Sequence, residues 1–509
     1  MQNKKRMNIY KSLIYVLVLS VIAAMLVTLF CGCTKKCNAV SEYRIEAKYD
    51  PESRALKGTM TLNYINRSSE NLSELMLLLP PNAFLTSDTA PFTQNDMDKA
   101  YPGGFSRGEI TVENVRVNGK NVEVRYCENR QRMLIALPFS LKPSGRMTVT
   151  LEFDSIIPQA NGRYGAWDGR VNLGNWYPTA AVYKDGGWIY TDYTSIGDPF
   201  FTENSNYDIT LTLPSRYEAA ASAPGEKTEA GSEASWHFYG DSMRDFALVL
   251  YDSCKKISKT EGDVTVNCYY TDSDDAADAA IKCACDAIRL FGDLFGKYPY
   301  KELSIAQTNF FIGGMEYSGL VMIDDSYFIS GNVHPLENVT VHETAHQWWY
   351  GGAGNDQINE AWIDEGLATY CTMLYYEKYK EPEDFRMYYK YYITNGYRFS
   401  RERAEEGGNY SPVMNRPLSE FENAVVYNML CYEKSAMMFQ TIRELIGDDA
   451  FFSSLGKLYK EAAGGTVTAE KVKSTFARET TKPIAEVIDG WLAGNVYLPY
   501  IRQKAHYKA

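Results

Sequence analysis

The chain has 509 residues, of which 45% are hydrophobic and 23% charged, so it is long enough for two or three ordinary domains. It carries 52 basic and 64 acidic residues, a formal net charge of −12. Nucleic-acid-binding proteins normally present a basic face, so the acidic balance argues against that class. A mean hydropathy of −0.34 and a single long apolar stretch exclude a protein with many membrane spans.

The long apolar stretch stands at the N-terminus, where a basic head over residues 4–11 precedes an uncharged run over residues 12–33. This order is typical of an export signal, and the positive-inside rule places the rest of the chain outside the cytoplasm. The run is long enough to remain as an uncleaved anchor. Alternatively, Phe30-Cys31-Gly32-Cys33 resembles an imperfect bacterial lipoprotein box, with cleavage before Cys33. Both alternatives make residues 1–40 a signal or anchor segment of an outward-facing, membrane-attached protein.

Residues 41–260 show the period-two alternation of apolar and polar side chains that is typical of strands with one buried face. Asn118-Gly119, between two valine-rich runs, predicts a hairpin turn. Many short strands separated by Gly, Pro and Asn predict an all-β saddle or sandwich. The clearest alternating runs cover residues 43–49, 60–64, 147–153 and 207–213.

Around residue 270 the period changes, and helical spacing of apolar residues dominates most of the chain from there to the end. The boundary between the two predicted domains is placed between residues 260 and 261. Ser273 is placed to cap a first helix that closes at Gly296. A short mixed segment over residues 303–322 follows, and the polar stretch over residues 401–415 is expected to be a loop. Later helices are predicted over residues 429–445, 450–463 and 469–476.

Two of the five histidines, His342 and His346, flank Glu343 in an HExxH pattern. On a helix, residues i and i+4 lie only ~40° apart around the axis, so both imidazoles face one point. Zinc requires nitrogen ligands at about 2.0–2.1 Å that converge from one side. Glu343 lies about 100° away around the axis, where its carboxylate can take a proton from water. The pattern therefore predicts a catalytic zinc site.

A third ligand is expected from a second helix. Gly351, Gly352 and Gly354 break the first helix, and helical spacing resumes near Glu360. Glu365 follows His346 after eighteen intervening residues, a distance that lets an antiparallel helix return past the first. Two neutral nitrogens, one carboxylate and one open position form the catalytic rather than the structural pattern, and they predict one Zn²⁺ per chain.

These motifs resemble those of the gluzincins, and specifically of the aminopeptidase N family. Gly313-Gly314-Met315-Glu316-Tyr317 resembles the Gly-Ala-Met-Glu-Asn motif of that family, and Tyr432-Glu433-Lys434-Ser435 resembles its Tyr-Glu-Lys-Gly motif. The likeness extends over nearly all of residues 41–499. It implies an α+β multidomain chain in which an all-β saddle domain (41–260) precedes a mainly helical, thermolysin-like catalytic domain with a small mixed sheet (261–509). The resemblance is to a short form without the C-terminal helical-repeat domain.

The resemblance also implies a role for each residue of the catalytic set. His342, His346 and Glu365 bind zinc. Glu343 acts as general base and then passes the proton to the leaving amine. Tyr432 donates a hydrogen bond to the oxyanion of the tetrahedral intermediate.

Substrate binding is implied for the motif over residues 313–316. Glu316 would bind the free α-ammonium, and the backbone of Gly313 and Gly314 would pair with the extended peptide, with Met315 between them and Glu316. Two departures concern this end of the site: Tyr317 replaces the family's Asn, and residues 173–179, aligned with a Gln-x-Glu segment of typical members, offer no carboxylate. Ser435 replaces the Gly of the tyrosine motif.

The sequence therefore predicts a zinc-dependent peptidase acting outside the cell, most directly an aminopeptidase. Its partners would be a peptide substrate and the membrane at its N-terminus, with no nucleic acid and no evident protein partner. A zinc endopeptidase of the same fold is the alternative that the missing second carboxylate favours. From another class, a catalytically inert surface-binding module remains an alternative, although that reading predicts broken ligands.

Overall fold

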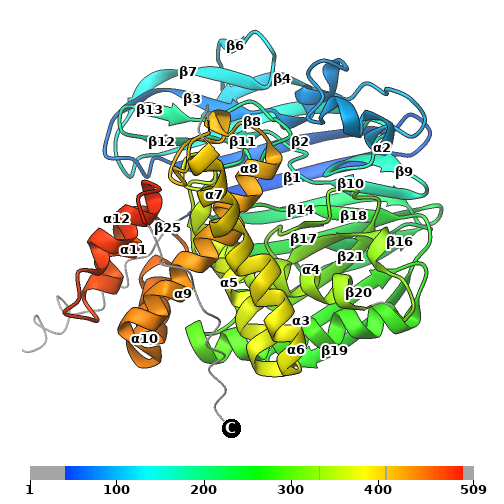
Figure 1. Cartoon of the computed structure of the whole chain (residues 1–509). Helices are drawn as coiled ribbons and strands as arrows, with labels where there is room; N and C mark the ends of the chain where they lie inside the picture. The colour runs from blue at the N-terminus through cyan, green and yellow to red at the C-terminus, as the bar shows by residue number, and fades with distance from the viewer. Residues whose placement is uncertain (1–39, 332, 407–409, 497–509) are drawn as a thin grey trace, which may run out of the picture. The chain divides into compact units, whose positions relative to one another are not determined.

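The computed structural model describes residues 40–331, 333–406 and 410–496. From Ser41 onward these residues belong to one compact unit, and the predicted signal or anchor segment lies outside the described residues. Among the described residues, no helix is both long and apolar enough to cross a bilayer. In Figure 1 a β-rich part, blue to green, leads into a part with a second sheet and most of the helices, green to red.

The largest sheet has eight strands in the order β16-β17-β14-β1-β2-β8-β4-β5. Buried and exposed side chains alternate along β1, β8 and β14, which confirms the period-two prediction. Its pairs are antiparallel except for β1 with β14, where Tyr43 lies opposite Tyr207. The strands are β1 (Ser41–Asp50), β2 (Ala55–Ile65), β4 (Glu109–Val117), β5 (Lys120–Asn121), β8 (Arg146–Ile156), β14 (Ser205–Pro214), β16 (Gly225–Ala230) and β17 (Glu233–Met243).

Smaller sheets complete the β-rich part, and together with the large sheet they enclose one apolar core. One has the order β11-β3-β7-β6 and another the order β15-β18-β10-β9, while β12 and β13 form a hairpin. Their strands are β3 (Leu72–Leu78), β6 (Val124–Tyr126), β7 (Arg132–Leu141), β9 (Tyr164–Trp167), β10 (Arg170–Leu173), β11 (Thr179–Ala180), β12 (Val182–Lys184), β13 (Gly187–Ile189), β15 (Glu218–Ala221) and β18 (Leu248–Tyr251). Short helical turns in this part are η1 (Pro80–Leu85), η2 (Gln94–Asp96) and α2 (Met97–Ala100).

A second sheet of five strands, in the order β19-β20-β21-β23-β22, supports the helices. Strand β22 is its edge strand and pairs antiparallel with β23, Gly314 opposite Ile323. The sheet already includes β19, which begins at Lys255, so the chain enters it a few residues before the predicted boundary at 261. The strands are β19 (Lys255–Glu261), β20 (Val264–Tyr270), β21 (Glu302–Thr308), β22 (Gly314–Met315) and β23 (Leu320–Asp324).

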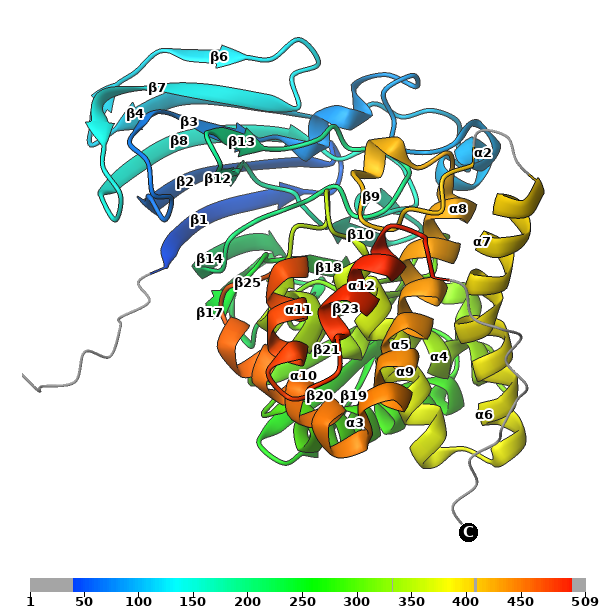
Figure 2. The same cartoon turned by 60° about the vertical axis from the view of Figure 1, so that its left-hand side comes forward.

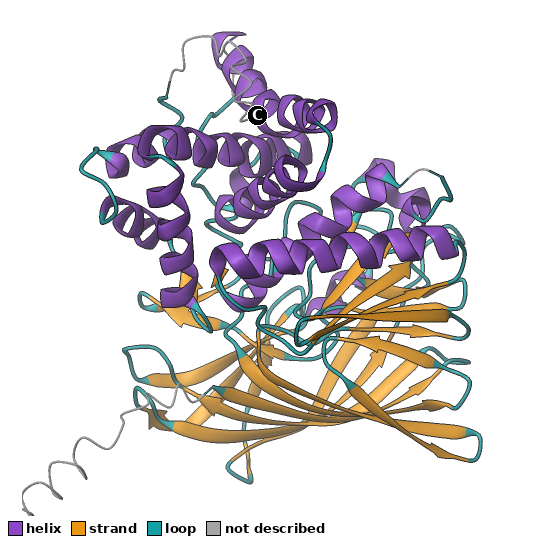
Figure 3. Ribbon diagram, turned by 90° about the horizontal axis from the view of Figure 1, so that it is seen from below, coloured by secondary structure: helices purple, strands orange, loops and turns teal. Residues whose placement is uncertain are grey.

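Helix α3 (Asp274–Phe295) packs on this sheet; the Ser273 side chain caps its first turn and Gly296 ends it, as predicted. Figures 2 and 3 show the strands and the helices gathered on different sides of the described chain.

The expected loop over residues 401–415 is partly wrong, because α7 continues through Glu406. The remaining helices are α4 (His334–Ala345), α5 (Trp362–Tyr379), α6 (Pro382–Tyr388), α7 (Asn395–Glu406), α8 (Ala424–Asn428), α9 (Ser435–Ile446), α10 (Asp448–Ala462), α11 (Ala469–Ala477) and α12 (Ile484–Leu492), with the π-helical segments η4 (Gln347–Gly352), η5 (Tyr389–Thr394) and η7 (Met429–Lys434), the 3₁₀ turns η3 (Asp325–Tyr327) and η6 (Leu418–Glu420), and the short strands β24 (Gly354–Asn355) and β25 (Thr466–Val467).

Arg244 joins the β-rich part to the helical part. Its side chain is buried, and Nε donates a 2.8 Å hydrogen bond to the backbone oxygen of Tyr350. The guanidinium also donates to the backbone oxygens of Thr202 and, at 2.9 Å, of Gly465. Gly354 leaves room for it, since an added Cβ there would lie 2.1 Å from the Arg244 Cζ. One buried cation thus satisfies backbone oxygens from three distant segments.

Candidate active site

The three predicted zinc ligands meet at one point. His342 lies in the last turn of α4, His346 directly follows that helix, and Glu365 lies in the first turn of α5. Nε2 of His342 and Nε2 of His346 are 3.1 Å apart, and Oε2 of Glu365 is 3.4 and 3.3 Å from them. Donors bound to zinc at about 2.0–2.1 Å in tetrahedral geometry lie about 3.3–3.4 Å apart. The triangle therefore has the dimensions that a zinc ion requires.

The protein environment also leaves these donor atoms available to a metal. Oε2 of Glu365 is buried and has no hydrogen-bond partner, which is costly for a carboxylate unless a cation takes that place. Nδ1 of His346 lies 3.1 Å from the backbone oxygen of Trp349. A proton on Nδ1 satisfies this contact and leaves the Nε2 lone pair directed at the triangle. The donor set fits Zn²⁺.

The segment after His346 explains how the chain reverses from α4 to α5. Trp349 and Tyr350 leave helical geometry, and Tyr350 has a φ of 154°, in a region that side chains with a Cβ seldom adopt. Arg244 binds the Tyr350 backbone oxygen, and the Tyr350 hydroxyl donates to the Asp245 carboxylate. Both partners come from the β-rich part, which therefore holds the strained turn that brings Glu365 back to the histidines.

Glu343, the predicted general base, lies beside the ligands and against the edge strand. An added Cβ on Gly314 would lie only 2.2 Å from Oε1 of Glu343 and 2.7 Å from Cγ2 of Val339. Only glycine allows this approach of strand β22 to helix α4. Burial, with a contribution from the nearby Glu365 charge, raises the pKa of Glu343 to about 8. The carboxylate is therefore placed to accept and return a proton.

Tyr432 reaches the same point from the π-helical segment η7. Its hydroxyl donates a 2.6 Å hydrogen bond to Oε1 of Glu365, and its ring stacks on His342 with centroids 5.6 Å apart and planes 9° apart. Burial, with the Glu365 charge adding to it, raises the pKa of Tyr432 well above its usual value, so the phenol stays a donor. The Tyr427 hydroxyl is farther from the same oxygen, at 3.5 Å.

The predicted substrate-binding residues follow the edge strand. Gly313, with a φ of 117°, and Gly314 line the cavity, whereas the Met315 side chain is buried and its sulfur lies 2.7 Å from Nη1 of Arg163. Glu316 is buried in the cavity wall, and Nε2 of Gln357 donates a 3.2 Å hydrogen bond to its Oε1. Burial, with the neighbouring carboxylates adding to it, raises the pKa of Glu316 well above its usual value.

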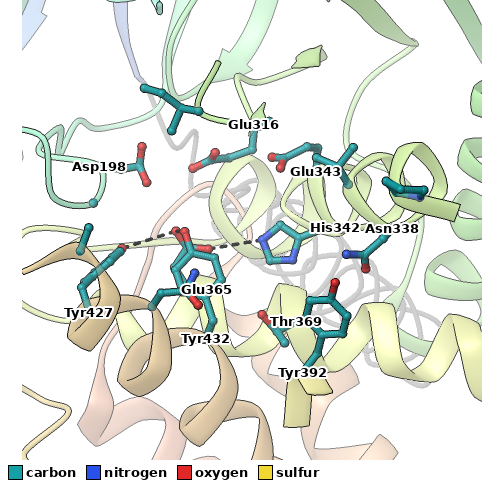
Figure 4. A pocket seen from close by; sticks show the side chains of 18 of the residues that line it. Asp198, Glu316, Asn338, His342, Glu343, Glu365, Thr369, Tyr392, Tyr427 and Tyr432 are labelled. Atoms are coloured by element: carbon teal, nitrogen blue, oxygen red, sulfur yellow. Dashed lines mark hydrogen bonds and ion pairs between the residues drawn. The ribbon is translucent and has the colours of Figure 1, made fainter. Parts of the chain in front are cut away.

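All the site residues predicted from the sequence, except Met315, line one cavity of about 920 Å³, part of which is drawn in Figure 4. The aligned segment over residues 173–179 does not line it. Two buried residues of the β-rich part, Arg163 and Asp198, do, and the sequence analysis missed both. Asp198 lies in an irregular segment between β13 and β14, and no spacing pattern connects it with the zinc motif.

The cavity is also lined by a group of exposed apolar side chains that the sequence did not indicate. They come from the loop before β22 and from α6 and η5. Their exposure is unusual for large apolar side chains and suits a surface that contacts a ligand. The group comprises Ile312, Met387, Tyr391 and Tyr392.

A comparison with family models agrees with this geometry. The model described as peptidase family M1 domain matches residues 279–491, which include α4, α5 and η7. This stretch of the chain is therefore similar to the peptidase family M1 domain. The match agrees with the resemblance to the aminopeptidase N family that the motifs indicated, and the matched residues include the whole triangle of metal donors.

Curated relatives and solved structures extend the likeness beyond the M1 domain. The chain is 21% identical to aminopeptidase 2 of Candida albicans over 76% of this chain and 44% of that protein, and 21% identical to aminopeptidase N of Lactobacillus helveticus over 75% and 46%. It spans about half the length of these relatives. The structure of an M1 zinc metallopeptidase from Deinococcus radiodurans superposes with a TM-score of 0.61 at 18% identity, covering 90% of this chain and 94% of that one. A mutant of the latter enzyme bound to a Tyr-Ser-Ala substrate gives the same TM-score. The predicted fold class, a β-rich part followed by a helical catalytic part, is confirmed.

Proposed function

We propose that this chain is a zinc-dependent metallopeptidase, and specifically an aminopeptidase that releases N-terminal residues from peptides. The observation that carries the proposal is the triangle of His342, His346 and Glu365 donors, 3.1 to 3.4 Å apart, with one buried oxygen lacking a partner. Such a set of two nitrogens and one carboxylate leaves a fourth position open for the reaction.

The proposed chemistry assigns each step to a residue of the cavity. A bound zinc ion supplies Lewis acidity that activates water and polarises the scissile carbonyl. Glu343 takes a proton from the attacking water and returns it to the leaving amine. Tyr432 donates to the negative charge that develops on the carbonyl oxygen, a contribution of about 3 kcal/mol when one such donor is compared with none.

The edge strand β22 supports the assignment to a peptide substrate. An unpaired strand edge offers backbone donors and acceptors to an extended chain. Strand β22 ends at Met315, directly before Glu316, so a peptide paired antiparallel with Gly313 and Gly314 would bring its N-terminus near that carboxylate. The names of the relatives, which are aminopeptidases, support the same substrate class.

The cellular location is a separate part of the proposal. The basic head and uncharged run of residues 4–33 support an exported protein that stays attached to the outer side of a membrane, either through a lipid at Cys33 or through an uncleaved segment. Mass spectrometry of the mature N-terminus distinguishes the two forms, because only lipidation removes residues 1–32 and adds acyl mass.

Two measurements test the proposed activity. Purified wild-type protein should contain about one zinc ion per chain, and Glu343→Gln should keep the metal while turnover falls by several powers of ten. A peptide and its N-acetylated twin then separate the aminopeptidase from the endopeptidase. Equal cleavage of both would replace the aminopeptidase proposal by the endopeptidase, and full activity of Glu343→Gln would end the mechanism altogether.

A further inference from the structure

Residues 173–179, which correspond to the Gln-x-Glu segment of typical family members, do not form the end of the cavity around Glu316. The Tyr317 hydroxyl donates a 2.9 Å hydrogen bond to Oδ1 of Asn175, and an added Cβ on Gly174 would lie 2.0 Å from that hydroxyl oxygen. The Tyr317 side chain therefore packs directly on the segment where a second carboxylate was sought. No residue of that segment lines the cavity.

A carboxylate from another segment faces Glu316 instead. Asp198 is buried, lines the same cavity, and lies beside Glu316 in Figure 4, on the side away from Asn338. Glu316, Glu365 and His346 are close enough to interact electrostatically with Asp198, so this carboxylate lies in the part of the cavity that contains the metal triangle.

Arg163 holds Asp198 in this place. The two side chains, each 9% exposed, form an ion pair, and Nη2 of Arg163 donates a 3.4 Å hydrogen bond to the backbone oxygen of Gly197. Nη1 of Arg163 also touches the sulfur of Met315, at 2.7 Å, in the edge strand β22. A single guanidinium thus fixes the Asp198 segment relative to the strand that would bind the peptide.

We propose that Asp198 and Glu316 together bind the α-ammonium of the substrate, with Arg163 as the residue that positions Asp198. This inference rests on the proposed aminopeptidase function and assigns the second specificity-determining residue of that site. With both carboxylates in place, the part of the cavity beside Glu316 selects a free amino terminus and not merely an extended peptide.

The burial of both carboxylates agrees with this assignment. Asp198 and Glu316 are each almost completely buried, and a buried negative charge is costly unless a cation lies beside it. A substrate ammonium adds such a cation beside Glu316 and the pair of Asp198 with Arg163, whereas an N-acetyl group adds none.

Asp198→Asn in the full-length, zinc-loaded protein tests the inference. Because the ammonium loses a partner in both ground and transition states, we expect KM for a free-amine tripeptide to rise at least about tenfold with kcat nearly unchanged. The preference for this tripeptide over its N-acetylated twin should fall by a similar factor. Asp192→Asn, in the same irregular segment but half-exposed and outside the cavity, is the matched control and should change neither value.

Removing one partner of a buried ion pair destabilises a protein, so the double variant Arg163→Met with Asp198→Asn serves if the single variant does not fold. It should show the same loss of preference. An undiminished preference in either folded variant overturns the role of Asp198. If the wild-type protein itself hydrolyses both tripeptides equally, the aminopeptidase proposal fails instead, and the zinc content shows whether the hydrolytic site is still intact.

Discussion

Tyr432 donates a 2.6 Å hydrogen bond to Oε1 of Glu365, while Oε2 of the same carboxylate faces both His342 and His346. One carboxylate thus connects the predicted oxyanion donor to the metal triangle. Because Glu365 is held by the rigid start of α5 and Tyr432 by the π-helical segment η7, their contact fixes the position of two helical elements relative to the metal site.

The first prediction concerns this contact. In Tyr432→Phe the ring remains stacked on His342 but the hydroxyl is lost, so kcat should fall by about 10²–10³-fold, as for removal of one oxyanion donor. Zinc content and KM should change little. Tyr427→Phe is the control, because its hydroxyl lies 3.5 Å from the same oxygen and should contribute far less. Loss of zinc from Tyr432→Phe would show instead that the phenol mainly holds Glu365.

The second prediction concerns the glycine in the edge strand. Gly314→Ala places a methyl group where Oε1 of Glu343 lies, at 2.2 Å, so strand or carboxylate must shift. A displacement of about 1 Å at a catalytic group costs on the order of 10²-fold in rate, and we expect kcat/KM to fall by that amount with little loss of zinc. Gly187→Ala, where nothing lies within 4 Å of the new Cβ, should leave activity unchanged. Equal activities of the two variants would contradict the close approach.

The third prediction concerns metal removal. In the proposed site zinc binds only the folded chain, through Glu365 and two histidines, so free zinc at a thousandfold excess over Kd should add about 4 kcal/mol to the free energy of unfolding. A chelator should lower the Tm of the wild-type protein, and added zinc should restore it. In Glu365→Gln, which lacks the charged ligand, zinc content should fall and the Tm should no longer respond to chelator. A chelator-sensitive Tm in that variant would argue against Glu365 as a ligand.

The fourth prediction concerns Lys434, which belongs to the motif of Tyr432 but lies outside the metal site. It is buried, and Nζ donates a 2.7 Å hydrogen bond to the backbone oxygen of Pro412. Burial, with the charge of Arg416 adding to it, lowers the pKa of Lys434 from 10.5 to about 8. The folded chain therefore binds fewer protons than the unfolded chain between these pH values, and this contribution to the free energy of unfolding rises with pH.

Denaturant unfolding at several pH values tests this linkage. Relative to Lys434→Met, which cannot titrate, the free energy of unfolding of the wild-type protein should increase by about 3 kcal/mol from pH ~8 to pH ~10.5. The gain should be complete above the pKa of the unfolded chain and absent below that of the folded chain. A difference between the two proteins that stays constant over this range would show that Lys434 is not desolvated.

The sequence predicted the parts of the molecule that follow from local periodicity or from a spacing rule. Alternation located β1, β8 and β14, and the i, i+4 rule placed His342 and His346 on one side of α4. These features depend on neighbours along the chain, so a single sequence is sufficient to find them.

Other parts depend on contacts between distant segments, and the sequence did not reveal them. Asp198 enters the cavity because Arg163, thirty-five positions earlier, pairs with it, and no pattern around either residue signals that pair. The burial of Met315, directly before Glu316, likewise depends on contacts with distant residues of the β-rich part. The expected loop begins too early at Arg401 because Glu402, Arg403 and Glu406 are exposed at the end of α7, where a helix accommodates charged side chains.

The contacts of Arg244 limit how far this chain can be shortened. A fragment that starts at the second sheet would retain the backbone oxygens of Tyr350 and Gly465 but lose the guanidinium that satisfies them. The strained turn behind the metal triangle would lose its support at the same time. A fragment limited to residues 255–496 is therefore a poor expression target, and the β-rich part must be supplied with it.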